Sequence, residues 1–242
     1  MDNAIEITNL TKKYKDVTAV DDLSLTIGQG ELFALLGVNG AGKTTLAKML
    51  SCLILPTSGS AKILGYDVVK EPVKVKELIA ISPQETAVAK NLTVQENLGL
   101  MVGVSGFDKE KRDRKVRELI EDFGLEEVRN KYAGKLSGGW QRRLSIAMAL
   151  IGEPKVLFLD EPTLGLDVFA RRELWRIIES LKGKITVVLT THYMEEAEKL
   201  SDRLCIMKKG KIIAIGTANQ MVLKTGASSF EDAFVKIVEE CR

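Results

Sequence analysis

The stretch from Gly37 to Thr44, GVNGAGKT, combines residue types at a spacing suited to holding phosphate. It fits the pattern G-x-x-x-x-G-K-[ST], follows the apolar run ELFALLGV and opens a helical pattern, as a phosphate-binding loop requires. Glycines let backbone N–H groups encircle phosphate oxygens, and the start of the helix adds a partial positive charge. We expect Lys43 to reach the β- and γ-phosphates and the Thr44 hydroxyl to bind Mg²⁺. The alternative is a glycine-rich turn with an exposed lysine, which the flanking strand and helix patterns disfavour.

Two carboxylates, Asp160 and Glu161, end a second apolar run in VLFLDEP. Ligands of parallel α/β sheets gather at the carboxyl ends of strands, and neighbouring strand residues point in opposite directions. We therefore expect Asp160 in the Mg²⁺ shell and Glu161 as the general base that polarises the attacking water. An acidic pair after a strand is usually only its polar end, and the lysine loop favours the functional interpretation.

Three further side chains are candidates for the same site. His192, the only histidine, follows KITVVLTT at the end of another strand, where a neutral imidazole can contact the γ-phosphate or hold the water. Gln84, in ISPQE, ends a shorter strand, from which its amide can reach the metal or the water. Tyr14 stands on a strand upstream of the loop, and its ring can stack on a purine. Structural or ordinary surface positions are the alternatives for all three.

A second anion-binding helix start follows in LSGGW, from Leu136 to Trp140. A serine and two glycines before an apolar-periodic run are typical of a capped helix that holds an anion. One domain needs only one phosphate cradle, so the second suggests a nucleotide held by another copy. In a two-fold dimer, head-to-tail pairing would place Ser137 and Gly139 of one subunit over the γ-phosphate bound by Lys43 of the other.

Strand and helix patterns place these residues in an α/β fold. Alternation of apolar and polar residues from Ile5 to Ile27 predicts antiparallel strands, and a helix is expected from Lys43 to Leu55. Dense charge with apolar residues at helical spacing from Thr93 to Gly134 predicts a separate helical lobe. After Ser137, alternating helices and strands predict a parallel sheet with right-handed crossovers. The last expected strands form a hairpin about Lys209-Gly210, followed by one or two short helices.

Composition bounds the class of protein. The 242 residues are 45% hydrophobic and 28% charged, which fits one large soluble domain. The balance of 35 basic and 33 acidic residues gives no electrostatic reason to expect a nucleic-acid partner. The three cysteines are scattered, which favours reduced thiols in a cytosolic protein. With no secretory signal and no apolar run long enough to cross a bilayer, the chain is expected to work at a membrane only by docking on another protein.

The motifs, in this order, resemble the nucleotide-binding subunits of ATP-binding-cassette (ABC) proteins over nearly the whole chain. Leu136 to Trp140 is similar to the family's signature motif, Leu157 to Glu161 to its Walker B strand, and Asp167 to its D-loop. The resemblance implies ATP and Mg²⁺ as ligands, with Glu161, His192 and Gln84 at the reaction. It also implies Thr44, Gln84 and Asp160 at the metal. The residues it implies at ATP are Tyr14, Gly37, Asn39, Gly40, Ala41, Gly42, Lys43, Thr44 and Thr45, with Ser137, Gly138 and Gly139 of the second copy.

The resemblance implies a P-loop NTPase core with a mainly parallel sheet, an N-terminal antiparallel β-subdomain and an inserted helical subdomain. Residues 1–242 then form a single domain. Its ATP-binding core is 1–84 and 153–220, its helical subdomain with the signature motif is 85–152, and its helical tail is 221–242. Trp140 departs from the family's usual glutamine. We expect activity to survive this change because the serine and both glycines are retained.

A single cassette without coiled coils looks like the ATPase subunit of a transporter, lying on the inner face of the cell membrane. The expected partners are a second copy or a related cassette and separate integral membrane subunits, without nucleic acid. The lobe after Gln84 resembles the surface that receives a coupling helix. The tail SSFEDAFVKIVEE resembles an element of drug, lipid or polysaccharide exporters, although Phe230 and Ala233 depart from it, so the prediction leans to export. A soluble nucleotide-dependent clamp on nucleic acid and a module that holds ATP without turnover are the alternatives.

Overall fold

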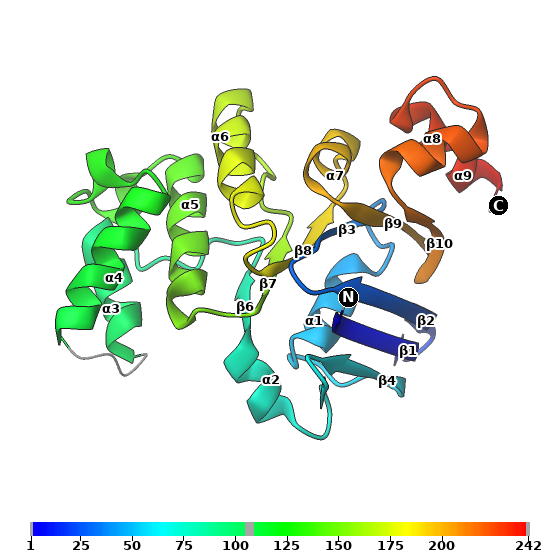
Figure 1. The fold of residues 1–242 in the computed structure, drawn as a ribbon, viewed down its shortest axis with the longest axis horizontal. Helices are drawn as coiled ribbons and strands as arrows, with labels where there is room; N and C mark the ends of the chain where they lie inside the picture. The colour runs from blue at the N-terminus through cyan, green and yellow to red at the C-terminus, as the bar shows by residue number, and fades with distance from the viewer. Residues whose placement is uncertain (1, 105–108, 241–242) are drawn as a thin grey trace.

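Two β-sheets enclose helix α1 (Lys43–Leu50) between them in the computed structural model, which describes residues 2–104 and 109–240 (Figure 1). The larger sheet has the strand order β10-β9-β3-β8-β7-β6, in which β10 is antiparallel to β9 and the other neighbours are parallel. Its strands are β3 (Leu32–Leu36), β6 (Ile79–Ser82), β7 (Val156–Asp160), β8 (Thr186–Thr191), β9 (Arg203–Lys208) and β10 (Lys211–Gly216). The smaller, antiparallel sheet β2-β1-β4-β5 consists of β1 (Asn3–Tyr14), β2 (Val17–Gly28), β4 (Ser58–Ile63) and β5 (Tyr66–Asp67).

Strand β3 shows why the larger sheet is buried on both faces. All five of its residues are buried, and successive side chains enter different cores. Leu32, Ala34 and Leu36 join a cluster with the helices on one face. Phe33 and Leu35 join a second cluster with α1 and the antiparallel sheet. The parallel strands are therefore continuous apolar runs, and their polar ends lie at one edge.

A helical lobe extends from one end of the larger sheet, on the left of Figure 1. It contains α3 (Val94–Val104), α4 (Lys109–Asp122) and α5 (Gly138–Ala149), and the helix-periodic side chains of α4 are buried in it. The remaining helices are α2 (Pro72–Leu78), α6 (Val168–Glu179), α7 (Met194–Leu200), α8 (Ala218–Thr225) and α9 (Phe230–Glu240), with 3₁₀ turns at η1 (Glu126–Val128), η2 (Ala133–Lys135) and η3 (Leu150–Gly152). No helix among residues 2–104 and 109–240 is long and apolar enough to cross a membrane.

The parallel sheet, the β9–β10 hairpin and the helical lobe are confirmed, whereas the expected length of α1 is wrong. The helix ends at Leu50 rather than Leu55. The Ser51 hydroxyl donates back to the Ala47 carbonyl, and Cys52 takes a left-handed conformation with φ of 57°. The boundary expected at residue 221 falls inside α8, which starts at Ala218 behind a Thr217–Gln220 capping box. Residues 1, 105–108 and 241–242 of the expected domain lie outside the described residues.

Candidate active site

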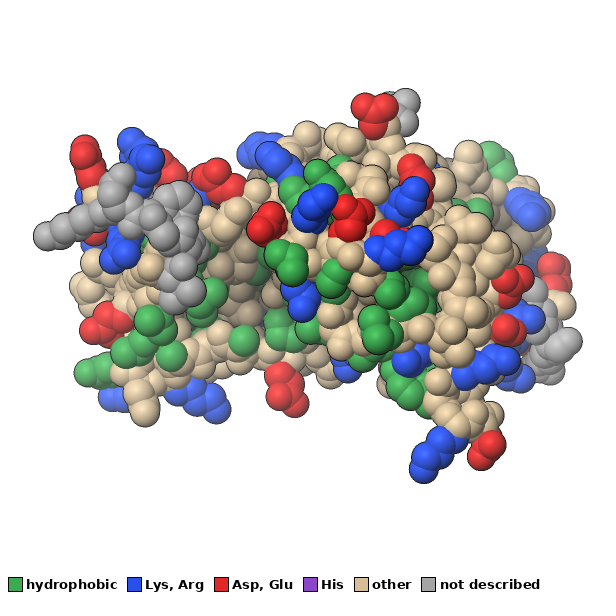
Figure 2. Space-filling model, turned by 90° about the horizontal axis from the view of Figure 1, so that it is seen from below, with side chains coloured by type: hydrophobic (Ala, Val, Ile, Leu, Met, Phe, Trp, Pro, Cys, Tyr) green, Lys and Arg blue, Asp and Glu red, His purple; other side chains and the backbone are tan. Residues whose placement is uncertain are grey.

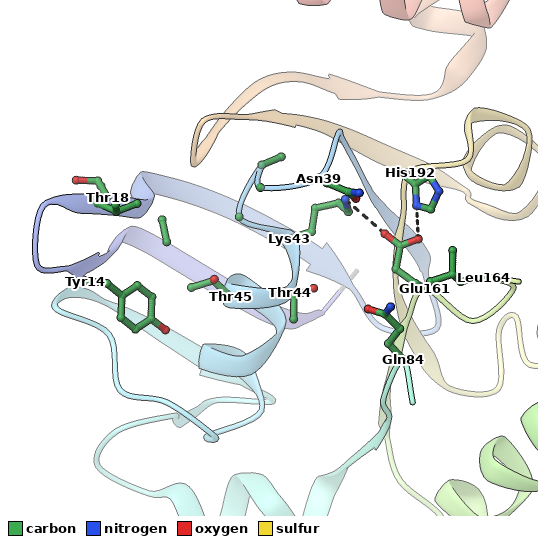
Figure 3. A pocket seen from close by; sticks show the side chains of 15 residues that line it. Tyr14, Thr18, Asn39, Lys43, Thr44, Thr45, Gln84, Glu161, Leu164 and His192 are labelled. Carbon is green, nitrogen blue, oxygen red and sulfur yellow. Dashed lines mark hydrogen bonds and ion pairs between the residues drawn. The ribbon is translucent and has the colours of Figure 1, made fainter. Parts of the chain in front are cut away.

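A cavity of about 620 Å³ lies where the carboxyl ends of the parallel strands face the β1–β2 hairpin (Figure 3). It is lined by Tyr14, Val17, Thr18, Ala19, Asn39, Gly40, Ala41, Gly42, Lys43, Thr44, Thr45, Gln84, Glu161, Leu164 and His192. Every candidate from the lysine loop except Gly37 therefore lines one cavity, and so do Tyr14, Gln84, Glu161 and His192, whereas Asp160 does not. This is the edge at which open α/β sheets hold their ligands.

The lysine loop adopts a conformation that only glycine permits at two of its positions. Gly42 has φ of 103°, and a Cβ there would lie 2.3 Å from the Ala19 carbonyl oxygen. A Cβ on Gly37 would lie 2.5 Å from the Met207 carbonyl oxygen on β9. Gly42 is also the N-cap of α1 and provides no capping side chain, so the first N–H groups of the helix are directed at the cavity. Phosphate oxygens are the natural acceptors for such groups.

Glu161 joins the two other ionisable candidates at the centre of the cavity. Its Oε1 lies 3.5 Å from Lys43 Nζ, and its Oε2 lies 2.7 Å from His192 Nδ1 (Figure 3). Lys43 and Glu161 are only 6% and 7% exposed, and Lys43 Nζ also donates to the Gly37 carbonyl at 2.7 Å. The pair is therefore well shielded from solvent and its geometry is tightly determined.

The backbone at Glu161 explains how its side chain reaches the cavity. Glu161 follows directly after β7 with φ of 47°, a conformation that non-glycine residues rarely adopt and that is often found at functional sites. Its N–H donates to both the carbonyl and the hydroxyl oxygen of Thr190 on the adjacent strand β8. The ring of His192 contacts the ring of Tyr193 with centroids 4.1 Å apart, which restrains the imidazole.

Thr44 and Asp160 place two oxygens together beside this pair. Thr44 Oγ1 donates to Asp160 Oδ1 at 3.1 Å, and Thr190 donates to the same oxygen. Within the described part of the chain, no cluster of three or more His, Cys, Asp or Glu residues is arranged to hold a metal ion. Mg²⁺ is usually held by one or two carboxylates together with substrate phosphates and water, so this oxygen pair beside a phosphate loop fits it.

Gln84 and Tyr14 mark two sides of the cavity. Figure 3 shows the Gln84 side chain below Glu161 and the Tyr14 ring at the far end, beyond Thr44 and Thr45. Tyr14 is 45% exposed, and Lys12 Nζ lies 4.9 Å from its ring centroid.

Ser137, Gly138 and Gly139 do not line this cavity. Ser137 is the exposed N-cap of α5, and its side chain makes no capping hydrogen bond. A Cβ on Gly139 would lie 2.8 Å from Ala170 Cβ, so this glycine allows α6 to pack against α5. The second anion-binding helix start is therefore not part of the chain's own phosphate cavity.

Trp140 lies in the first turn of α5 and packs against the hydrophobic core. Its ring is half-buried, and the Arg143 guanidinium lies over it at 4.5 Å. Arg143 also forms an ion pair with Glu173 on α6. The tryptophan is thus linked to α6 through Arg143, while Ser137 and Gly138 stay exposed.

Several residues of the cavity were missed by sequence reasoning. The start of β2 lines the cavity because β2 pairs with β1, which places Val17 opposite Tyr14. The lining residues from β2 are Val17, Thr18 and Ala19. The short loop after Tyr14 could have suggested such a hairpin. Leu164 and Thr190 carried no sequence signal, since their roles depend on the path after β7 and on the pairing of β7 with β8.

Comparisons with known proteins agree with this geometry. Residues 20–164 match the family model described as ABC transporter. The chain is 42% identical over 240 residues to the doxorubicin resistance ATP-binding protein DrrA of Mycobacterium tuberculosis, covering 98% of this chain and 71% of that protein. It is 41% identical over 227 residues to the human phospholipid-transporting ATPase ABCA3, covering 92% of this chain and 13% of that protein.

Solved structures show the same relationship. An ATP-binding subunit of an ABC transporter superposes with a TM-score of 0.85 at 28% identity and covers 97% of this chain and 99% of its own. A dimeric ATP-binding cassette in a post-hydrolysis state, bound to ADP and phosphate, has a TM-score of 0.79 at 27% identity, covering 88% of this chain and 98% of its own. The chain therefore belongs to the ABC transporter family, as one of its ATP-hydrolysing subunits.

Proposed function

We propose that this chain drives export by hydrolysing ATP in sites shared between two head-to-tail copies, with Glu161 as the general base. The observation that carries the proposal is the Lys43–Glu161–His192 cluster, a buried carboxylate held between a cation and an imidazole inside a phosphate-binding cavity. Each of the three residues has a partner within the cluster, which keeps the groups in place for the reaction.

The chemistry follows from these contacts. The phosphates of ATP compete with Glu161 for Lys43, because Lys43 Nζ lies at the lysine loop and donates to Gly37. Glu161 Oε1 is then released from its ion pair, while Oε2 stays bonded to His192. Oε1 takes a proton from water as the oxygen of that water bonds to the γ-phosphorus. The bond from the γ-phosphorus to the bridging oxygen breaks, and ADP and phosphate are the products.

The other cavity residues orient the nucleotide. Thr44, Asp160 and Gln84 would hold Mg²⁺, which neutralises charge on the phosphates. The purine would stack on Tyr14 at the far end of the cavity. The backbone N–H groups at the start of α1 would bind the phosphate oxygens, together with those of the loop from Gly37 to Thr45.

The shared site is supported by surface features outside the cavity. Ser137 and Gly138 expose a helix start that the chain's own cavity does not use. Val168 and Phe169, at the start of α6, are 58% and 82% exposed. Adjacent exposed apolar side chains are typical of an interface. A second copy, or a closely related cassette, would cover them and bring its signature helix to the γ-phosphate.

Mixing two inactive variants tests the shared site. Lys43→Ala removes the phosphate ligand, and Ser137→Arg blocks the signature helix. A heterodimer of the two contains one doubly defective site and one intact site, so random mixing should restore about a quarter of wild-type phosphate release if dimers exchange freely. A chain that carries both substitutions, mixed with the Ser137→Arg chain, serves as the control, because no dimer in that mixture contains an intact site. No recovery in the first mixture contradicts the shared site.

A groove on the helical lobe supports a membrane partner. It has a volume of about 840 Å³ and lies between α3 and α4, where Leu100 is 54% exposed at its rim. Arg112 and Arg117 of α4 and Arg129, which follows η1, also line it. We infer that the lobe at 85–152 receives a helix of an integral membrane subunit on the inner face of the membrane. DrrA and ABCA3 are named for drug resistance and phospholipid transport, which supports an amphipathic cargo and export.

Charge on the surface argues against the nucleic-acid clamp. Figure 2 shows Lys/Arg and Asp/Glu side chains intermixed on the face it presents, and the formal net charge of the chain is only +2. A nucleic-acid binder usually gathers basic residues on one surface. We expect the tagged protein to retain integral membrane subunits from a detergent extract and to shift neither DNA nor RNA in a gel. Leu100→Glu should abolish membrane capture and leave phosphate release unchanged. A shift of either nucleic acid at physiological salt would favour the clamp.

A further inference from the structure

One face of the signature helix α5 holds the loop that carries Gln84. Positions 141, 142 and 145 share this face because residues separated by three or four positions are neighbours on a helix. Each contacts the segment 82–86. Ser145 Oγ lies 3.3 Å from Ser82 Oγ, and Gln141 Oε1 accepts a bond from Thr86 Oγ1 at 3.4 Å. The loop is therefore attached to the helix at both of its ends.

Arg142 makes the central contact. Its Nη1 donates to the Pro83 carbonyl at 2.5 Å, and its Nη2 donates to the Gln84 carbonyl. The residue is 3% exposed, so these carbonyls replace water as partners of a buried charge. Burial lowers the pKa of this guanidinium, and the Asp160 and Glu196 carboxylates oppose that effect. A planar fork with two parallel N–H groups can hold both carbonyls at once, which a lysine ammonium cannot do with the same geometry.

The two ends of this assembly serve different nucleotides in the proposed dimer. Gln84 lines the chain's own cavity, and Ser137 begins the helix that would reach the partner's γ-phosphate. Arg142 stands five residues from Ser137, within the first turns of α5. We propose that Arg142 is a positioning residue that couples the two sites by holding Gln84 and the signature helix as one unit. The inference rests on the proposed shared site.

The mixed-variant experiment separates the two sites for Arg142. In the Lys43→Ala and Ser137→Arg mixture, the single intact site takes Lys43 and Gln84 from one chain and Ser137 from the other. Arg142→Met can therefore be placed on either chain. Coupling in both directions predicts that kcat of the intact site falls about tenfold in each placement. ADP affinity of the isolated Arg142→Met chain should remain within about twofold of wild type by calorimetry, because Arg142 does not line the cavity.

Arg143→Met is the matched control, since Arg143 is the next residue and its guanidinium contacts Glu173 and Trp140 instead of the loop. It should change kcat by less than about threefold in both placements. The proposal is overturned if Arg142→Met lowers kcat in only one placement or in neither. It is also overturned if the decrease in kcat equals that of the Arg143→Met control. Arg142→Lys, which keeps the charge, replaces Arg142→Met if the methionine variant does not fold. If neither variant folds, a role in folding is enough to explain the contacts of Arg142, and the proposal is also overturned. Failure of the parent mixture to recover activity contradicts the shared site itself and not this inference alone.

Discussion

Glu161→Gln is expected to lower phosphate release by about 10²-fold or more while ATP binding persists, because general bases contribute about 10²–10⁴-fold. The amide keeps the size of the carboxylate and can still accept a bond from His192, but it cannot take the proton of the attacking water. ATP therefore stays intact between the two copies, and its γ-phosphate continues to join them. Size-exclusion chromatography with ATP and Mg²⁺ should show a stable dimer, and a phosphate-release assay should show the loss of turnover.

Glu196→Gln is the matched control for this substitution. Glu196 is also a buried carboxyl, but it accepts bonds from Thr163 and Trp175 and does not line the cavity. Burial raises the pKa of Glu196, and the glutamine amide keeps the size of the side chain and an oxygen that accepts the same bonds. Phosphate release by this variant should stay close to wild type. A Glu161→Gln chain that remains monomeric with ATP and Mg²⁺, or that still turns over, would contradict the proposed role of Glu161.

Sequence reasoning predicted which side chains converge because the motifs lie at strand ends. Lys43 follows β3, Glu161 follows β7 and His192 follows β8, and parallel strands bring such ends to one edge. The direct contact of Glu161 with His192 was not predictable in the same way. It requires that β7 and β8 be neighbours, with Asp160 opposite Thr190, and strand order depends on packing that no local pattern encodes.

The close approaches between segments distant in the sequence could not be predicted either. The absence of a side chain at Gly42 matters because the Ala19 carbonyl lies against it, and a Cβ on Gly210 of the β9–β10 turn would lie 3.0 Å from the same carbonyl oxygen. A sequence motif shows that glycine occurs at such a position. Only the fold shows which backbone group packs against it. Trp140 is similar, since the residue types of the signature motif do not determine its contact with Arg143, which in turn pairs with Glu173 on α6.

Lys43→Ala should weaken ATP binding by about 10- to 100-fold, since hydrogen bonds to charged groups contribute about 1.5–3 kcal/mol. The ammonium group is buried and aimed at the loop, so solvent screens its attraction for phosphate only weakly. The substitution also leaves the Glu161 carboxylate with His192 alone, and the uncompensated negative charge near the phosphates weakens binding further. Calorimetric titration with ATP measures the affinity, and a thermal unfolding curve establishes that the variant is folded.

Lys48→Ala is the matched control, because Lys48 lies on the same helix, is exposed and does not line the cavity. Its affinity should equal that of wild type, and equal affinities for all three proteins would refute the assignment of Lys43 as the phosphate ligand.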